Sequence, residues 1–494
     1  MNFKKSLPAL LALLVLSQTM TACGDSAEPS TAETESDILT AAQTEAPVDP
    51  RIQQKADYFA ALDHTVPAEP ITFTFISDTD DIAVEAENGE KLNDAMYRRN
   101  IEIEEKLGYK IVDIKTDIET DTVSKVKNSV MSGDGAYDAV STRTYMVASL
   151  FSGGYLRDLN DFATLQLDQP WWNQTANQNM SFGGVRYCGL SALCHRADTV
   201  CELVLMNKRI AEELDMEVPY QAVREGKWTW EMLHSMIKQV PLDSNGDGQM
   251  DHTDVVGMVG QSQDVAAATI ACGMTFFEKD ADDIAVFTLN KEENASKFQT
   301  IFDFFNDKTY VYCVGLYKGI DWDYWGTKFL NGESLFMLEF PGNFSVYTNM
   351  EDDYGVLPMP KYDQAQENYR TMTNLWHTSA LCIPRVTSVS DAEVGLVLDA
   401  MSFLSYVDVE PMFAETYLEN RYIRDEDSAE MINIVLGSMY YDPCFAIYET
   451  WGYPINIPLT SLQSGTNTFS STVAKQQKGI EKAIEKTKNY LENY

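Results

Sequence analysis

The chain has 494 residues, and its 75 acidic side chains outnumber its 37 lysines and arginines, which gives a formal net charge of −38. This length allows about two to four domains, and an apolar fraction of 45% argues against disorder over most of the chain. The acid excess disfavours nucleic acids and anionic membrane surfaces, whose recognition depends on lysine and arginine. A neutral or cationic dissolved partner fits this charge better.

Residues 1–22 have the pattern of an export signal, because two lysines precede an apolar run that is too short to span a bilayer. Residues 20–24 read Met-Thr-Ala-Cys-Gly and resemble a bacterial lipobox, in which Cys23 is acylated and becomes the mature N-terminus. A plain secretory signal is the alternative. We therefore expect an extracytoplasmic protein that a lipid on Cys23 anchors to the outer face of the cell membrane.

The segment after the lipobox is rich in Ser, Thr, Ala, Glu and Pro, with few large apolar side chains between residues 24 and 50. Such a composition cannot bury enough apolar surface to offset the entropy of ordering the chain. We expect a lipid-anchored and mostly disordered linker over residues 23–69.

Strand-like and helix-like patterns alternate after the linker. In chain order, the predicted elements are a strand at 71–76, a helix at 92–107, a strand at 110–115, a helix at 121–132 and a strand at 137–141. This order is typical of a parallel sheet covered by helices. Ligands of such sheets bind beyond the carboxyl ends of the strands, which places Ser77–Asp78 and Ser141–Tyr145 at the predicted site.

Helix-like patterns predominate in the rest of the chain. The predicted elements there are strands at 203–207 and 255–259 and helices at 208–214, 229–240, 291–305, 391–405, 409–420, 427–437 and 472–491.

Seven cysteines remain once Cys23 is set aside, so at least one thiol must be free. No Cys-x-x-Cys pair suggests zinc or redox chemistry, and buried reduced thiols are favoured in a domain of this size. A bridge among Cys188, Cys194 and Cys201 stays open.

Residues 243–254 have the spacing of a calcium loop, with oxygen-bearing side chains at loop positions 1, 3, 5, 9 and 12 and glycine at position 6. Calcium takes about six to eight oxygen ligands, so this spacing predicts a structural Ca²⁺ site. Position 12 is Asp and not the usual Glu, and a metal-free turn is the alternative. The predicted ligands are Asp243, Asn245, Asp247, Gln249, Asp251 and Asp254.

Enzyme motifs are absent from the sequence: the five histidines form no H-E-x-x-H, and neither G-x-S-x-G nor a phosphate-binding glycine loop occurs. The many acidic residues leave a glycosidase pair of carboxylates open. Tryptophans are more informative, because an indole face can stack on a sugar ring. For Trp376 and Trp451, cleft and core positions are equally favoured, whereas core packing is favoured for Trp228, Trp230, Trp322 and Trp325.

Six short motifs carry a family resemblance: GGYLRDL at 153–159, GVRY at 184–187, MNK at 206–208, GKWTW at 226–230, FLNGESLFM at 329–337 and YGVLPMPK at 354–361. Together they are similar to motifs of the family-1 extracellular solute-binding lipoproteins of bacterial ABC importers, in particular the sugar-binding members. The resemblance extends loosely over most of residues 70–494.

This resemblance implies an α/β periplasmic-binding-protein fold of type II, with two lobes, a hinge and an interlobe cleft. Residues 70–165 plus 362–420 would form lobe 1, and residues 166–361 plus 421–494 would form lobe 2. The implied function is capture without chemistry: a monomeric protein that binds an oligosaccharide and delivers it to ABC permease subunits. The alternatives are a binder of peptide or another polar solute in the same fold, or a surface-anchored enzyme that degrades glycans.

The same resemblance assigns ligand contacts by position. Arg143 and Tyr145 would lie on a first-lobe loop, and Asn343 and Phe344 would follow a strand of the second lobe. With the strand-end and tryptophan arguments, the candidate ligand-binding residues are Asp78, Arg143, Tyr145, Asn343, Phe344, Trp376 and Trp451.

Overall fold

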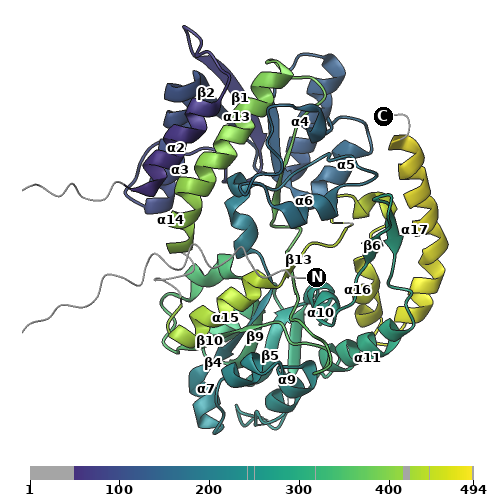
Figure 1. Ribbon diagram of the computed structural model, residues 1–494. Coiled ribbons are helices and arrows are strands. Elements are labelled where there is room, and N and C mark those ends of the chain that lie inside the picture. Colours follow the sequence, from purple (N-terminus) through teal and green to yellow (C-terminus); the bar gives the residue numbers. More distant parts are fainter. Residues whose placement is uncertain are drawn as a thin grey trace, which may run out of the picture. The chain divides into compact units, whose positions relative to one another are not determined.

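The structure is a computed structural model that describes residues 49–241, 243–249, 251–317, 319–415, 423–443 and 445–491. Residues 50–494 form one compact unit, which carries every element named below (Figure 1). The predicted export signal, the predicted lipidation site Cys23 and most of the predicted linker lie outside the described residues.

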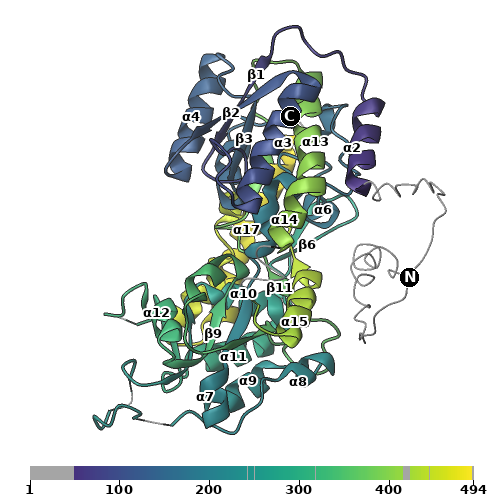
Figure 2. The ribbon, with the colours of Figure 1, turned by 90° about the vertical axis from the view of Figure 1, so that its left-hand side faces the viewer.

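A four-stranded sheet has the strand order β12-β3-β1-β2. Its strands are β1 (Ile71–Ser77), β2 (Tyr109–Lys115), β3 (Ala139–Arg143) and β12 (Ser379–Cys382). Strand β1 runs parallel to β2 and β3, as the alternating pattern predicts, and β12 adds an antiparallel edge. Helix α4 (Glu119–Ser132) covers one face, and α3 (Lys91–Leu107) and α13 (Asp391–Leu404) lie on the other (Figure 2).

A five-stranded sheet has the strand order β10-β4-β9-β5-β8. Its strands are β4 (Leu203–Asn207), β5 (Val256–Gln261), β8 (Val311–Val314), β9 (Ser334–Glu339) and β10 (Tyr354–Pro358). Strand β5 is parallel to β8 and β9, and β4 is antiparallel to β9 and β10. Every residue of β4, β9 and β10 is buried, as expected for a sheet covered on both faces.

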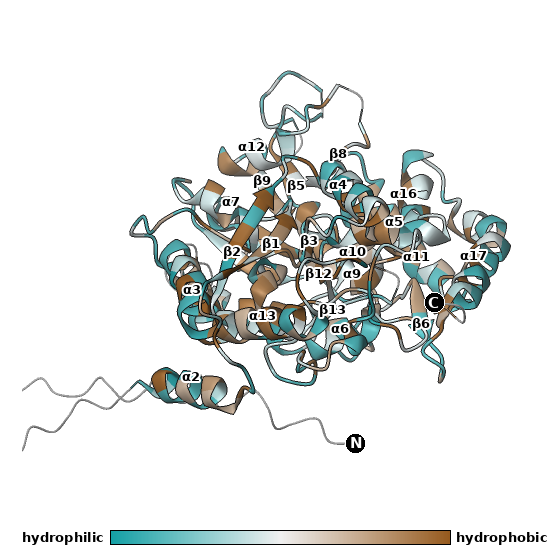
Figure 3. Cartoon of the chain, turned by 90° about the horizontal axis from the view of Figure 1, so that it is seen from above, coloured by the Kyte–Doolittle hydropathy of each residue, from teal (hydrophilic) through white to brown (hydrophobic). Residues whose placement is uncertain are grey.

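Further helices lie around the second sheet and continue along the chain as far as residue 491. They are α7 (Lys208–Glu213), α8 (Tyr220–Arg224), α9 (Trp230–Ile237), α10 (Asp264–Ala271), α11 (Glu293–Phe305), α12 (Tyr324–Leu330), α15 (Glu426–Gly437), α16 (Asn456–Gln463) and α17 (Phe469–Leu491). Figure 3 shows hydrophobic residues along β1, β5 and β9 and hydrophilic residues over much of α17. Among the described residues, no helix combines the length and the apolar character that crossing a membrane requires.

Two stretches of chain connect the sheets and lie side by side. One leads from the 3₁₀ segment η3 (Ala192–Thr199) into β4, and the other leads from β11 (Thr371–Met372) to β12. The Glu202 N–H donates to the Met372 carbonyl (3.1 Å), and β11 also pairs with β13 (Met439–Tyr440). These paired crossings lie between the two sheets, where the family resemblance implies a hinge.

The remaining elements are α2 (Pro50–Ala61), α5 (Val147–Phe151), α6 (Gln174–Met180), the hairpin β6 (Phe277–Lys279) and β7 (Ala285–Phe287), the π-helical turn η5 (Ser405–Val409) and α14 (Glu410–Ala414). The predicted helix at 409–420 corresponds to the end of η5 and to α14, and its part from 416 onward lies outside the described residues. Every other predicted strand and helix is confirmed with boundaries that shift by a few residues.

Helix α2 corrects the predicted linker, because its residues 50–61 are ordered and pack on the first sheet's core. The Tyr58 ring stacks on Phe403 at 3.9 Å, and its hydroxyl donates to Asp399 (2.8 Å). Trp171 and Trp172 donate their indole N–H groups to the same carboxylate at 3.0 and 3.1 Å. Trp171 and Trp172, which follow residue 165 and are therefore predicted for lobe 2, pack in the core of lobe 1.

The cysteines among the described residues are buried free thiols, so the open bridge among the first three is not formed. They are Cys188, Cys194, Cys201, Cys272, Cys313 and Cys382.

Candidate ligand-binding site

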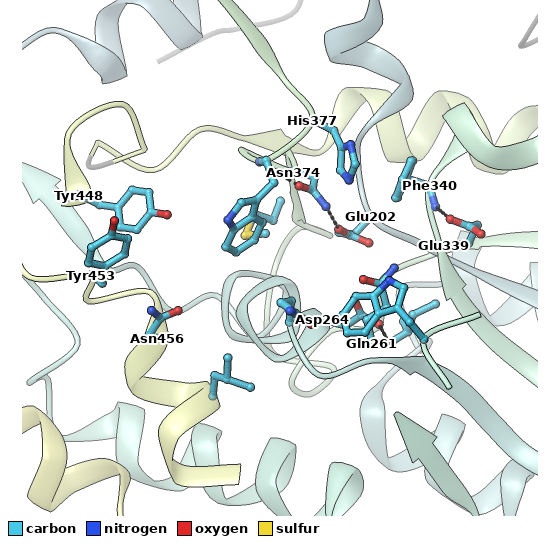
Figure 4. Close-up of a pocket in the computed structure, with 16 residues that line it drawn as sticks. Glu202, Gln261, Asp264, Glu339, Phe340, Asn374, His377, Tyr448, Tyr453 and Asn456 are labelled. Carbon is cyan, nitrogen blue, oxygen red and sulfur yellow. Dashed lines mark hydrogen bonds between the residues drawn. The ribbon is translucent and has the colours of Figure 1, made fainter. Parts of the chain in front are cut away.

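A cavity of about 350 Å³ lies at one edge of the five-stranded sheet (Figure 4). We call it the carboxylate cavity, because Glu202, Asp264 and Glu339 line it together. The other lining residues come from the end of β5 and the turn after it, from the end of β9 and the residue after it, from the loop before α12, from β11 and its connection to β12, and from the segment 448–459. They are Gln261, Gln263, Trp322, Leu338, Phe340, Met372, Asn374, Trp376, His377, Tyr448, Tyr453, Asn456 and Leu459.

Sheet register brings the three acids to one edge. Glu339 ends β9, and the antiparallel pairing of Leu203 with Glu339 places the preceding Glu202 beside it. Strand β5 runs parallel to β9 and ends at the same edge, where Asp264 opens α10. In open α/β sheets, ligands bind beyond the carboxyl ends of the strands, so this edge is a favourable place for a site.

Neutral donors hold the Glu339 carboxylate. Its Oε1 accepts from the Phe340 N–H (2.9 Å) and from Asn343 Nδ2 (2.9 Å), and its Oε2 accepts from the Tyr347 hydroxyl (2.7 Å). These bonds fix the carboxyl group in place, and none of them comes from a cation.

The other two acids each use one oxygen in a hydrogen bond. Asn374 Nδ2 donates to Glu202 Oε1 (3.0 Å), and the Gln261 N–H donates to Asp264 Oδ2 (2.6 Å). No hydrogen bond between described residues reaches Glu202 Oε2 or Asp264 Oδ1. Each acid thus presents an oxygen to the cavity that it lines.

Burial makes these carboxyl groups difficult to ionise. It raises the pKa of Asp264 to about 7 and that of Glu339 to about 8. Burial, and next the charge of nearby Asp264, raise the pKa of Glu202 well above its usual range. Among the described residues that line the cavity there is no lysine or arginine, and no described cation is among the causes that shift the pKa of any of the three. The site therefore concentrates acidic groups without a compensating base.

Aromatic side chains form a further part of the lining. Tyr448 and Tyr453 lie on the side of the cavity away from Glu339 (Figure 4). Trp322 also lines it and is 52% exposed, so the predicted core position of this residue is wrong. Exposed ring faces beside amides and carboxylates are the mixed lining that small polar ligands require.

A second cavity of about 210 Å³ shares Phe340 and His377 with the first. We call it the arginine cavity, because Arg143 and Arg196 line it. Burial, and next the nearby Arg143 charge, lower the pKa of His377. Residues from the ends of β1 and β3 and from the turn after β9 line the arginine cavity, so both sheets contribute to the combined cleft.

The family model for bacterial extracellular solute-binding proteins matches residues 102–406, well over half of the chain. The chain belongs to this family. This membership makes it a binding protein and not an enzyme. No curated protein is similar enough in sequence to count as a relative.

Solved structures similar to this solute-binding protein share its fold at low sequence identity. An ABC substrate-binding protein from Listeria monocytogenes, in complex with cycloalternan, is 15% identical over 84% of this chain and 100% of its own, with a TM-score of 0.55. The cyclic alpha-maltosyl-1,6-maltose binding protein of Arthrobacter globiformis is 14% identical over the same shares, with a TM-score of 0.57. UgpB from Mycobacterium tuberculosis, in complex with glycerophosphocholine, is 13% identical over 85% and 99%, with a TM-score of 0.53. These likenesses confirm the two-lobed α/β periplasmic-binding-protein fold.

Four of the predicted contacts line the cleft of this solute-binding protein. Trp376 lines the carboxylate cavity, and Asp78, Arg143 and Asn343 line the arginine cavity. The Asp78 carboxylate accepts from the Thr142 hydroxyl (2.5 Å) and from the Arg143 N–H (3.2 Å), which orients it at the end of β1.

The other three predicted contacts lie elsewhere. Tyr145 lines neither of these cavities, and its hydroxyl donates to Glu119. Phe344 is completely buried in the core of the second sheet. Trp451 is 1% exposed, packs on Phe277 at 4.9 Å and donates its indole N–H to Thr487 (3.0 Å). The predictions for Phe344 and Trp451 are wrong, because both rings fill cores instead of the cleft.

In the predicted calcium loop, carboxylates accept hydrogen bonds from the loop's own backbone. Asp243 accepts from the Gly248 N–H (3.0 Å), and Asp254 accepts from the Asn245 N–H (3.1 Å). Within the described residues, no group of three or more His, Cys, Asp or Glu side chains gathers as a metal site would require. The calcium site stays a prediction.

Sequence reasoning missed the three acids of the carboxylate cavity. The strand-end rule that identified Asp78 also applies to the second sheet, where Glu339 ends an apolar strand and Asp264 closely follows another. Applying that rule twice finds these two residues. Glu202 precedes its strand, so only the antiparallel register with β9 reveals its position.

Proposed function

We propose that this protein captures an oligosaccharide in the cleft and delivers it, chemically unchanged, to the permease of an ABC importer. The observation that carries the proposal is the lining of the carboxylate cavity. Aromatic rings there can stack on the apolar faces of sugar rings, while amides and carboxyl groups bond the hydroxyls. The volume of about 350 Å³ is in the range of small-molecule sites.

The solved relatives support a saccharide over other solutes. The Listeria protein was solved with cycloalternan, and the Arthrobacter protein is described as a binder of a cyclic maltose derivative. The glycerophosphocholine complex indicates that this fold also holds other polar solutes, and peptide remains a further candidate. Ligand drives lobe closure only to the extent that it binds the closed state more tightly.

The transport role needs the protein at the membrane, and we propose a lipid on Cys23 as the anchor. The protein would then act as a monomer outside the cytoplasm and meet the permease subunits at the membrane surface. We also propose a structural Ca²⁺ in residues 243–254, supported by the spacing of its oxygen-bearing side chains.

Titration calorimetry with α- and β-linked neutral oligosaccharides tests the binding function. We expect Trp322→Ala to weaken the tightest of these ligands at least tenfold without lowering the melting temperature, because half of the indole is exposed. Met131→Ala is the matched control, since Met131 is an exposed apolar side chain on α4. Binding of peptides but of no oligosaccharide would contradict the proposal, as would unchanged affinity in Trp322→Ala.

A further inference from the structure

The carboxylate cavity gathers three acidic side chains away from water. Glu202, Asp264 and Glu339 are 4%, 7% and 1% exposed, and none of the described residues that line the cavity is a lysine or arginine. Ions that are removed from water without a partner of opposite charge destabilise a protein. Three acids within one cavity therefore need an explanation beyond packing.

The arginine cavity provides an internal comparison. Three aspartates line it as well, but Arg196 lies 3.6 Å from both Asp80 and Asp81. Arg143 also lines this cavity and donates its backbone N–H to Asp78 (3.2 Å). The chain thus balances its acids in one half of the cleft and leaves those of the other half unbalanced.

Two of the unbalanced acids still have an oxygen that can accept a hydrogen bond. Glu202 Oε2 and Asp264 Oδ1 receive none from the described residues, and both side chains line the cavity (Figure 4). A protonated amine has three N–H donors and one positive charge, so it can bond both oxygens at once. A hydroxyl has a single donor and no charge, so it satisfies one oxygen and leaves the charges unbalanced.

The aromatic lining suits the same ligand class. Tyr448, Tyr453 and Trp322 line the cavity with the acids. A cation over an aromatic face is attracted to the ring, and the same face stacks on the apolar side of a sugar. The net charge of −38 adds a long-range attraction for cations.

We propose that the solute is a cation, namely an oligosaccharide with a protonated amino group that bonds Glu202 and Asp264 within the field of Glu339. This inference rests on the proposed function for its saccharide part. Its cationic part rests on the charge and geometry of the cavity alone.

The test is a calorimetric comparison of matched ligands on the purified protein. Oligosaccharides of equal length and linkage, in both α- and β-linked series, are compared as hydroxyl and amino forms, and spermidine serves as a cation without a sugar. We expect the tightest binder to be an amino form, and we expect the matched hydroxyl form to bind at least tenfold more weakly. Glu202→Gln and Asp264→Asn should each remove most of this preference, whereas Glu231→Gln, at an exposed position on α9, should keep it.

The outcomes separate the two proposals. If the tightest binder is a neutral oligosaccharide and its amino form binds no better, the cationic inference is overturned. The proposed oligosaccharide function is not affected by that result. Binding of spermidine without any oligosaccharide supports the cationic inference and overturns the oligosaccharide function. Binding of none of these ligands overturns both. Thermal melts of each variant distinguish loss of binding from loss of folding, and an intact preference in both acid variants also overturns the inference.

Discussion

Replacing Asp264 with asparagine should stabilise the ligand-free protein at alkaline pH and have little effect at acid pH. Asparagine keeps a side-chain oxygen that can accept the Gln261 N–H, which donates to Asp264 Oδ2 at 2.6 Å. It removes a charge that the buried cavity stabilises poorly. The variant therefore isolates the free energy of ionising this carboxyl group in the folded state.

The magnitude follows from the pKa. The folded protein holds the Asp264 proton up to about pH 7, whereas the unfolded chain releases it near the ordinary value of 3.8. Between these values the folded state binds more protons, so wild-type stability falls as pH rises through this window. A pKa change of this size corresponds to about 4 kcal/mol of unfolding free energy. Asp264 and Glu202 titrate as an interacting pair, so part of this effect belongs to Glu202, and we expect about 2–4 kcal/mol for the variant.

Urea unfolding followed by tryptophan fluorescence measures this effect at a pH below 4 and at a pH above 8. The stability difference between variant and wild type should grow by about 2–4 kcal/mol from the acid to the alkaline condition. Glu231→Gln controls for the loss of a surface acid. A difference that is the same at both pH values would refute the reasoning, because the carboxyl group would then ionise equally in both states.

Three further predictions concern the rest of the molecule. Burial lowers the pKa of His195 to about 4, so the contribution of His195 to stability should fall by about 3 kcal/mol as pH drops from 6.5 to 4. Urea unfolding should show His195→Asn gaining about this much stability relative to wild type over the same pH range, and a difference between the two proteins that does not change with pH would contradict it. Trp451→Ala should destabilise the protein by about 3–5 kcal/mol in urea unfolding, because its ring fills a core, and a melting point near that of wild type would count against this placement. Calcium in excess of a chelator should raise the melting temperature of wild type and not that of Asp247→Ala, and equal melts with and without calcium would exclude the loop as a metal site.

Much of the first sheet could be predicted because its signals are local. Strand β1 alternates apolar and polar residues, and helix α3 ends at Gly108, whose φ of 75° is left-handed and favours glycine. Helix α2 could not be predicted in this way. Its order depends on Tyr58, which reaches Asp399 more than three hundred residues later in the sequence. Lys55 on the same helix pairs with the similarly distant Asp408 (3.0 Å). A polar helix whose tertiary contacts are remote in the sequence looks like a linker when only its composition is considered.

In the candidate site, too, residues with local sequence signals could be predicted, and residues that depend on tertiary packing could not. Asp78 was predicted because a buried strand leads directly into it, and the structure places it in the cleft. The contrast between Trp322 and Trp451 could not be predicted, because both stand among turn-forming residues and only tertiary packing exposes one ring and buries the other. Glu202 needed a strand register that joins residues more than a hundred positions apart.

A crystal structure of the protein with its tightest oligosaccharide ligand tests the central claim most directly. The account predicts sugar rings in the carboxylate cavity, against Trp322 and Tyr453, with a polar group of the ligand bonded to Glu202 and Asp264. A ligand bound elsewhere on the surface, or a saccharide cleaved in the crystal, would contradict the account.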